Sequence, residues 1–246
     1  MASKLRLDKL LSESGFGTRK EVKYLIKKGT VTVNGEQIKD PGFKVDPEKE
    51  KIEVNGEPVI HIKDIYLILH KPAGYITSTK DKEATVMELI SDVPRFEKLF
   101  PVGRLDKDTE GLLFITNDGE LAHRLTHPKW KVPKRYYVVI EGKLSENSKN
   151  LLEKGVKLGD FISKPAKVKV IKVHENTSEI EIEITEGKYH QIKRMLKKVG
   201  NPVIYLKRIS FGTLKLGKLP KGEYRFLNDE EVKKLKKAVG LLPASN

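Results

Sequence analysis

The chain has 246 residues, with 48 Lys and Arg against 34 Asp and Glu, a formal net charge of +14 and a pI near 9.6. It has no cysteine, which excludes disulfides, thiolate zinc sites and cysteine nucleophiles and fits a reducing compartment. No stretch approaches the roughly 20 apolar residues of a membrane helix, and residues 1–11 lack the apolar core of a signal peptide, so we expect a cytoplasmic protein.

The basic residues are concentrated in two segments. Residues 1–35 hold eight Lys and Arg against three acids, and residues 188–225 hold eleven against one. A positive excess gathered in patches favours polyanionic partners through long-range attraction and counterion release. An even coat of lysines would indicate only solubility, so the clustering predicts a nucleic-acid partner.

Two short helices are predicted at the start of a small domain that covers residues 1–60. Leucines from Leu7 to Leu11 recur at helical spacing, and two glycines then end the first helix. Thr18 opens the second helix, because Glu21 follows three residues later and completes a capping box. Gly29 ends this helix, whose exposed face is basic.

A small β element is predicted to follow the helices. A strand at Thr30–Val33 leads into the Asn34-Gly35 turn, which is a strong hairpin signal, and a second such turn lies at Asn55-Gly56. The segment Asp40–Asp64 is charged and contains prolines, so we expect it to be irregular. A linker is predicted near Pro58–Asp64, with a second domain over residues 61–246.

The segment RLDKLLSESGFGTRKEVKYLIKKGTVTVNG, residues 6–35, resembles an S4 domain, a small RNA-binding module of ribosomal proteins and RNA-modifying enzymes. The resemblance covers about the first 50 residues. It implies RNA contacts from a group of basic side chains: Arg6, Arg19, Lys20, Lys23 and Lys27.

The second domain is predicted to be rich in strands. Apolar runs and alternation place strands at Tyr66–Leu69, Tyr75–Thr77, Leu112–Thr116, Arg135–Ile140, Ala166–Val173, Ser178–Thr185, Val203–Arg208 and Glu223–Leu227. Helices are expected at Thr85–Ile90, Leu121–Thr126, Tyr189–Val199 and Asp229–Val239, and turns at residues 71–74, 117–119 and 175–176. Since strands outnumber helices and most connections are hairpin-like, we expect an α+β fold with a mixed or antiparallel β-sheet flanked by helices.

The segment GRLDKDTEGLLFITNDG, residues 103–119, places carboxylates at alternate positions, as a metal-binding loop does. Asp106, Asp108 and Glu110 match the opening of a calcium loop, but its twelfth position, which needs a bidentate carboxylate, is Asn117. A phosphatase loop fails too, because Glu110 stands where a threonine is required. We therefore expect no metal here.

A single catalytic carboxylate is the other interpretation of this segment. An ionised aspartate in a partly buried cleft needs a nearby cation to offset its desolvation. Arg104 would share the face of Asp106 in an extended loop, and the basic helix at residues 190–198 offers another partner. Chemistry on a nucleobase also needs an aromatic face for the flipped base, and Tyr136 or Tyr137 can supply it.

Three stretches together resemble the RsuA family of pseudouridine synthases: LILHKPAGYITST with PVGRLDKDTEGLLFITNDGEL, KRYYVVIEG, and EGKYHQIKRMLKKVGNPVIYLKRISFG. The resemblance runs from about Tyr66 to Phe226 and rests on the order and spacing of the motifs.

The resemblance implies a pseudouridine synthase fold with Asp106 as the catalytic aspartate, Tyr136 as the pocket tyrosine and Lys193 as the basic partner of the aspartate. We add Arg104 to the catalytic set and Arg194, next to Lys193, to the RNA-binding set. Relatives often have arginine where this chain has Lys193, and asparagine where it has His70.

The resemblance also implies the reaction. A uridine of ribosomal RNA is flipped out, its N-glycosidic bond is broken, and C5 is joined to C1′ without cofactor or metal. Three routes stay open for Asp106: attack on the sugar, attack on the base, or removal of a ribose proton. Tyr189-His190, where large-subunit relatives more often have Asn-Arg, favours 16S rRNA, free or in an assembling small subunit, with 23S rRNA as the alternative. We expect a monomer.

A non-enzymatic RNA-binding or ribosome-assembly factor is the alternative from another class. The joint presence of Asp106, Tyr136 and a base at Lys193 favours the enzyme. A zinc deaminase would need cysteines, and the pair His123 and His127 lacks a third ligand nearby. A methyltransferase would need a cofactor site such as a glycine-rich strand–helix turn, which we do not find.

Overall fold

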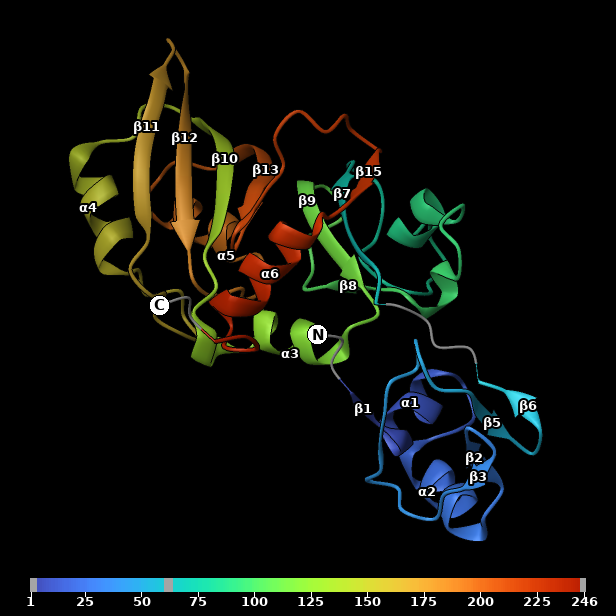
Figure 1. Cartoon of the computed structure of the whole chain (residues 1–246). Helices are drawn as coiled ribbons and strands as arrows, with labels where there is room; N and C mark the ends of the chain where they lie inside the picture. The colour runs from blue at the N-terminus through green and yellow to red at the C-terminus, as the bar shows by residue number, and fades with distance from the viewer. Residues whose placement is uncertain (1–3, 60–63, 244–246) are drawn as a thin grey trace. The chain divides into compact units, whose positions relative to one another are not determined.

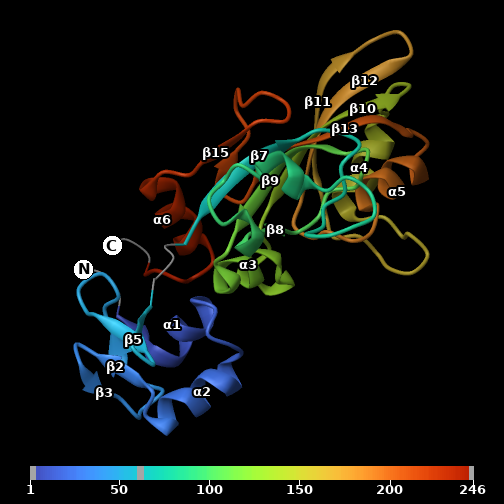
Figure 2. The ribbon, with the colours of Figure 1, turned by 90° about the vertical axis from the view of Figure 1, so that its right-hand side faces the viewer.

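The computed structural model describes residues 4–59 and 64–243. The chain divides into two compact units, residues 1–63 and 64–246, which Figure 1 and Figure 2 show in two orientations. The predicted linker near Pro58–Asp64 and the predicted boundary after residue 60 fall on residues 60–63, which lie outside the described part. None of the helices in the described ranges combines the length and apolar character needed to cross a membrane.

The first unit packs two helices on short strands. Its elements are β1 (Leu5–Arg6), α1 (Leu7–Glu13), α2 (Arg19–Lys28), β2 (Val31–Val33), β3 (Glu36–Gln37), β4 (Lys44–Val45), β5 (Ile52–Val54) and β6 (Glu57–Pro58). The predicted capping box of α2 is confirmed, because the Glu21 N–H donates to the Thr18 hydroxyl and the Thr18 N–H donates to the Glu21 carboxylate. Leu7, Val22 and Ile26 are fully buried in a core between the helices and the strands.

The two Asn-Gly turns are confirmed as hairpins. Asn34 and Gly35 both have positive φ, of 51° and 85°, as a two-residue turn between twisted strands requires, and Asn55-Gly56 repeats this geometry between β5 and β6. The prediction that Asp40–Asp64 is irregular is wrong in part, since β5 pairs with β2 in a four-stranded sheet. A three-residue strand is too short to give a clear alternation, and its pairing partner supplies the order.

The second unit contains a nine-stranded mixed sheet with helices on both faces, so the predicted α+β class is confirmed. Its strands are β7 (Tyr66–Lys71), β8 (Phe100–Val102), β9 (Glu110–Thr116), β10 (Lys134–Glu141), β11 (Lys167–Val173), β12 (Thr177–Ile184), β13 (Val203–Phe211), β14 (Leu214–Lys215) and β15 (Tyr224–Phe226). Its helices are α3 (Gly119–Thr126), α4 (Glu146–Lys154), α5 (Gln191–Lys198) and α6 (Asp229–Ala238), with 3₁₀ turns at Val86–Ile90, Phe96–Lys98 and Pro128–Trp130.

The strands run in the order β11-β12-β10-β13-β9-β7-β15, with β14 beside β13 and β8 beside β9. Figure 2 shows α4 and α5 on one face of the sheet and α3 and α6 on the other. Alternate residues of β9 therefore enter two different cores: Leu113 and Ile115 face the α5 side, and Leu112 and Phe114 face the α3 side. This explains why the centre of β9, residues 112–115, is continuously apolar instead of alternating.

The two halves of the sheet meet at a parallel contact between β9 and β13, where Glu110 is opposite Lys207 and Gly111 is opposite Arg208. A Cβ atom on Gly111 would lie 2.2 Å from the Arg208 carbonyl oxygen, and Gly111 has a φ of +111°. Only glycine allows this close backbone approach. The seam directly follows the segment 103–109, so it fixes the position of that loop.

Some local predictions differ from the structure. Helix α4 was not expected, because apart from Leu151 and Leu152 it is polar. The expected turn at residues 117–119 is instead the start of α3, with Asp118 as its N-cap. Helix α5 begins at Gln191 rather than at residue 189, because His190 is left-handed with a φ of 47°.

Candidate active site

Asp106 begins a tight turn between Val102 and the start of β9. The Thr109 N–H donates to the Asp106 carbonyl at 3.0 Å, so the predicted extended loop is wrong at this point. The turn carries the side chains of Asp106 and Asp108 to the same cation, Lys193 of α5. The carboxylates stand at alternate positions in the sequence because the turn directs both of them to one lysine.

Lys193 lies between the two carboxylates. Its Nζ is 3.0 Å from Asp106 Oδ2 and donates to Asp108 Oδ1 at 2.6 Å. Burial opposes its charge, but the hydrogen bonds to both aspartates outweigh burial and raise the pKa of Lys193. The His190 Nε2 lies 3.5 Å from the same oxygen of Asp106, and the ring of Tyr189 stacks on His190 at 3.8 Å.

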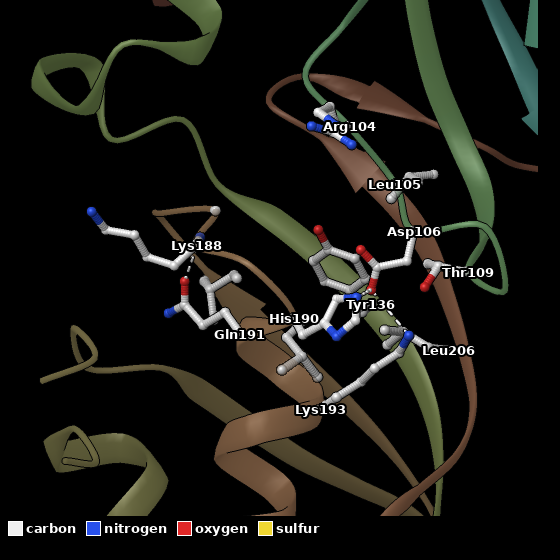
Figure 3. Close-up of a pocket in the computed structure, with 13 residues that line it drawn as sticks. Arg104, Leu105, Asp106, Thr109, Tyr136, Lys188, His190, Gln191, Lys193 and Leu206 are labelled. Atoms are coloured by element: carbon white, nitrogen blue, oxygen red, sulfur yellow. Dashed lines mark hydrogen bonds and ion pairs between the residues drawn. The ribbon is translucent and has the colours of Figure 1, made fainter. Parts of the chain in front are cut away.

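Asp106 faces a small open pocket between the loop, β10, β13 and the start of α5. Figure 3 shows the Tyr136 ring and the Asp106 carboxylate pointing into the same space. Tyr136 is 7% exposed, and Ile184 and Leu206 add apolar walls. An aromatic face, apolar sides and one carboxyl group at the mouth fit a flat polar ring such as a flipped base.

Lys71, at the end of β7, holds the turn from below. Its side chain is fully buried, and its Nζ donates to the carbonyl oxygens of Thr109 at 2.7 Å, Pro72 at 3.0 Å and Lys107 at 3.2 Å. Burial lowers the pKa of Lys71 to about 8, against the opposing attraction of Asp108, Glu110 and Asp106. The buried Lys71 amine thus supports the turn, because it donates hydrogen bonds to two carbonyl oxygens there, those of Lys107 and Thr109.

Glu110 fixes the other end of the turn. Its buried carboxylate accepts a hydrogen bond from the Tyr205 hydroxyl at 2.6 Å and lies 2.9 Å from Lys221 Nζ. Burial raises the pKa of Tyr205, and the hydrogen bond to Glu110 adds to this effect. Because Tyr205 is in β13, this contact ties the loop to the opposite half of the sheet.

Gln191 organises the segment that leads into α5. Its amide nitrogen donates to Glu186 Oε1 at 2.6 Å, and its amide oxygen accepts from the Lys188 N–H at 3.0 Å. The side chain is 3% exposed. These contacts close the short loop before α5, and they place His190 and Lys193 beside Asp106.

The structure brings three of the four predicted catalytic residues together: Asp106, Tyr136 and Lys193. Arg104 also lines the pocket, but Figure 3 shows its guanidinium pointing away from Asp106. Within the described residues no ion pair joins Arg104 to Asp106, and Lys193 occupies that role geometrically. Arg194 faces the other way, donating to the Leu158 carbonyl at 2.6 Å and pairing with Asp160.

The predicted RNA-binding residues of the first unit divide into two groups. Arg6 forms a two-pronged pair with the buried Asp8, at 3.0 and 2.9 Å, so its guanidinium supports the fold. The remaining four are exposed on α2: Arg19, Lys20, Lys23 and Lys27. They form a basic helix face that is open to an RNA backbone.

In the part of the chain that the structure describes, neither the carboxylates of residues 106–110 nor the histidine pair belongs to a cluster that could hold a metal ion. Asp106 and Asp108 face Lys193, whose ammonium group occupies the place that a metal ion would take. His123 and His127 approach each other as rings, with centroids 5.4 Å apart, at the exposed end of α3.

Sequence reasoning did not single out Lys71, His190 and Gln191 as site residues. A lysine that ends the otherwise apolar run LILHK is a signal for Lys71, since an unpaired lysine rarely ends a buried strand. His190 and Gln191 lie within a quoted motif, but their placement depends on a left-handed residue before α5 that no periodicity reveals.

Comparison with known proteins assigns families to both units. Residues 65–198, more than half of the chain, match the family model described as RNA pseudouridylate synthase, and residues 5–51 match the S4 domain. A crystal structure titled pseudouridylate synthase superimposes with a TM-score of 0.67 at 35% identity, covering 94% of this chain and 99% of that one.

Curated relatives align over nearly their whole length. An uncharacterized RNA pseudouridine synthase of Bacillus subtilis is 48% identical over 93% of this chain and 97% of its own. The ribosomal large subunit pseudouridine synthase B of Bacillus subtilis is 37% identical, covering 94% and 95%. The ribosomal small subunit pseudouridine synthase A of Vibrio parahaemolyticus is 38% identical, covering 93% and 98%.

Proposed function

This chain belongs to the RNA pseudouridylate synthase family, as an RsuA/RluB-type isomerase with an N-terminal S4 domain, and we propose that its substrate is ribosomal RNA and its catalytic carboxylate is Asp106. The observation that carries the proposal is the position of Asp106, at the mouth of a pocket walled by Tyr136 and 3.0 Å from Lys193. The other described carboxylate that lines a pocket with Tyr136, that of Glu186, forms no ion pair within the described residues.

The chemistry follows from these groups. The uridine leaves its stack and enters the pocket, where the Tyr136 ring and the apolar side chains of Ile184 and Leu206 hold the base. Lys193 pairs with the partly buried Asp106 carboxylate at 3.0 Å and directs it toward the pocket. The N1–C1′ bond breaks, the uracil turns, and C5 bonds to C1′. The hydrogen on C5 leaves as a proton and N1 gains one, so the product is an isomer of the substrate.

The two units divide the work in this proposal. Residues 1–60 act as the S4 RNA-binding domain through the exposed basic face of α2, and residues 61–246 act as the catalytic domain. Phosphate contacts of this kind give affinity without sequence information and depend on salt. Deletion of residues 1–58 should weaken rRNA binding more than it damages the catalytic fold. Equal binding by the shortened protein would mean that the S4 unit has no function in RNA binding.

We further propose 16S rRNA as the substrate, free or in an assembling small subunit. The support is Tyr189-His190, which resembles the small-subunit branch, and in the structure these two rings stack beside Asp106. The curated relatives do not separate the two subunits, because small- and large-subunit enzymes are almost equally similar, so 23S rRNA is the second candidate. A ribosomal RNA substrate implies a cytoplasmic reaction.

Mapping pseudouridines in rRNA by carbodiimide treatment and reverse transcription tests the substrate. A strain that lacks the protein should lose one stop in 16S rRNA and regain it on complementation. Loss of a stop in 23S rRNA instead would favour the second candidate.

The Asp106→Asn variant tests the catalytic assignment. It should abolish pseudouridine formation on transcribed rRNA and leave RNA binding nearly unchanged, because the amide keeps the shape of the side chain but cannot carry its charge. Full turnover by this variant would refute the role of Asp106.

A further inference from the structure

A second and larger pocket adjoins the catalytic pocket. It encloses about 540 Å³ and shares Arg104, Tyr136 and Lys188 with its neighbour. Its inner wall is formed by Val132 and Phe211. An RNA strand that places one nucleotide in the catalytic pocket would therefore continue directly into this second pocket.

Arg208 of β13 forms part of the inner wall and is 1% exposed. Its Nε donates to the Leu112 carbonyl at 2.8 Å, and its guanidinium carbon lies 5.0 Å from the centre of the Phe211 ring. Its Nη2, in contrast, is buried and has no hydrogen-bond partner. A buried charged donor without a partner is costly, so its presence indicates a missing acceptor.

Lys134 of β10 is a second cation in the same wall, and its side chain is half-buried. Its Nζ donates to the Val132 carbonyl at 2.9 Å and lies 5.5 Å from the centre of the Phe211 ring, which Arg208 also faces. Burial lowers the pKa of Lys134 to about 8, and the charge of Arg208 lowers it further. The positive charge of Arg208 therefore disfavours the charged form of Lys134.

The pocket has a strong excess of positive charge. The described residues that line it include five Lys and Arg side chains and one carboxylate, Glu186. That carboxylate is already engaged, since its Oε1 accepts hydrogen bonds from the Lys164 N–H at 2.7 Å and from Gln191 Nε2 at 2.6 Å. Neither Lys134 nor Arg208 forms an ion pair within the described residues, so Glu186 is the one lining carboxylate that opposes the five positive charges.

We propose that this second pocket binds a backbone phosphate of the RNA strand next to the flipped uridine, with the Arg208 guanidinium and the Lys134 ammonium group as donors. The inference rests on the proposed function for the identity of the RNA. A phosphate oxygen would satisfy the unpaired Arg208 nitrogen by a charge-assisted hydrogen bond and would relieve the repulsion between the two cations. The contact carries no sequence information; it sets the register of the strand, so that one base reaches Asp106.

The test uses the full-length protein and a short RNA that carries the uridine located by mapping. Lys134→Gln should weaken binding of this RNA about tenfold and should reduce the slope of log K against log salt by about 0.7 to 0.9, as loss of one phosphate contact requires. The matched control is Arg135→Gln, because Arg135 is the next residue of β10 and points to the opposite face, where it pairs with Glu183 at 3.1 Å; it should behave as the wild type.

A second measurement needs no protein variant. Neutral methylphosphonate linkages are placed one at a time in the same RNA, and binding to the wild-type protein is measured. One linkage beside the target uridine should weaken binding about tenfold, and this effect should be several-fold smaller in Lys134→Gln, where Arg208 alone remains to bind the phosphate. Equal sensitivity in both proteins, or an unchanged salt slope in Lys134→Gln, would overturn the proposal. Product formation by the wild-type protein on this RNA is scored in parallel, so that failure of the phosphate site is distinguished from failure of the proposed function.

Discussion

Replacement of Lys193 by methionine removes the cation that two carboxylates share while it keeps a straight side chain of similar length. At 3.0 Å from Asp106, a unit charge is worth about 1.4 kcal/mol at the dielectric constant of water and about 5.5 kcal/mol at an effective constant of about 20. The side chains of Lys193 and Asp106 are 24% and 30% exposed, so the value lies between these limits. A loss of about 2.7 kcal/mol corresponds to an approximately 100-fold slower reaction.

The measurement is single-turnover release of tritium from rRNA labelled at C5 of uridine, because the new C5–C1′ bond expels the hydrogen at that position. The control is Asp108→Asn. Asp108 contacts the same Lys193 at 2.6 Å but is 73% exposed, and exposed ion pairs contribute less than about 1 kcal/mol. We therefore expect a loss of about fivefold or less.

Two results would refute this reasoning. The first is a wild-type rate for Lys193→Met, which would mean that Asp106 needs no cation. The second is an equal loss in Asp108→Asn and Lys193→Met, which would assign the essential charge to Asp108. Lys193→Arg should retain most of the activity, since its charge can reach the same two aspartates.

Three further predictions concern the support of the site. Gly111→Ala should lower the free energy of unfolding by more than about 3 kcal/mol, because its Cβ would meet the Arg208 carbonyl oxygen; an unchanged urea midpoint would contradict this. Lys71→Met should slow turnover at least about tenfold with RNA affinity retained, because two carbonyls of the turn, those of Lys107 and Thr109, lose their donor; an unchanged single-turnover rate would refute it. Lys134, whose pKa burial lowers to about 8 with Arg208 adding and Glu186 opposing, is charged below that pH and neutral above it. RNA affinity should therefore fall as the pH rises through about 8 in the wild type, and Lys134→Gln should lack this decline; parallel titration curves would count against a phosphate contact.

Local patterns predicted much of the fold because their causes are local. The Thr18–Glu21 capping box and the two Asn-Gly turns depend on residues within a few positions of one another, and all three are present. The alternation of β11 and β12 predicted their hairpin, since one face of that pair is buried. Helix α4 was missed because it offers few apolar residues, and strand β5 because three residues are too short for a clear alternation; both gain their order from neighbours distant in sequence.

For the candidate site, the sequence predicted which motifs come together but not the detailed contacts between their side chains. Asp106, Tyr136 and Lys193 were assembled from three separate stretches, and the structure brings them to one pocket. Arg104 was placed beside Asp106 on the assumption of an extended loop, whereas in the structure its guanidinium points away from Asp106 and Lys193 pairs with that carboxylate. The support from Lys71 depends on tertiary contacts, which no spacing along the chain reveals.

The seam between β9 and β13 also determines when the protein becomes an enzyme. Asp106 belongs to the half of the sheet that contains β7, β8 and β9, whereas Tyr136 and Lys193 belong to the half built from β10 to β13. Lys193 follows Asp106 by 87 residues, so a chain emerging from the ribosome has its carboxylate long before the partner of that carboxylate. Contacts between residues so distant in sequence are slow to form, because a long loop must first be closed. The catalytic pocket is consequently absent from any partly folded form in which the halves are undocked, and catalysis itself reports that the two halves of the sheet have docked.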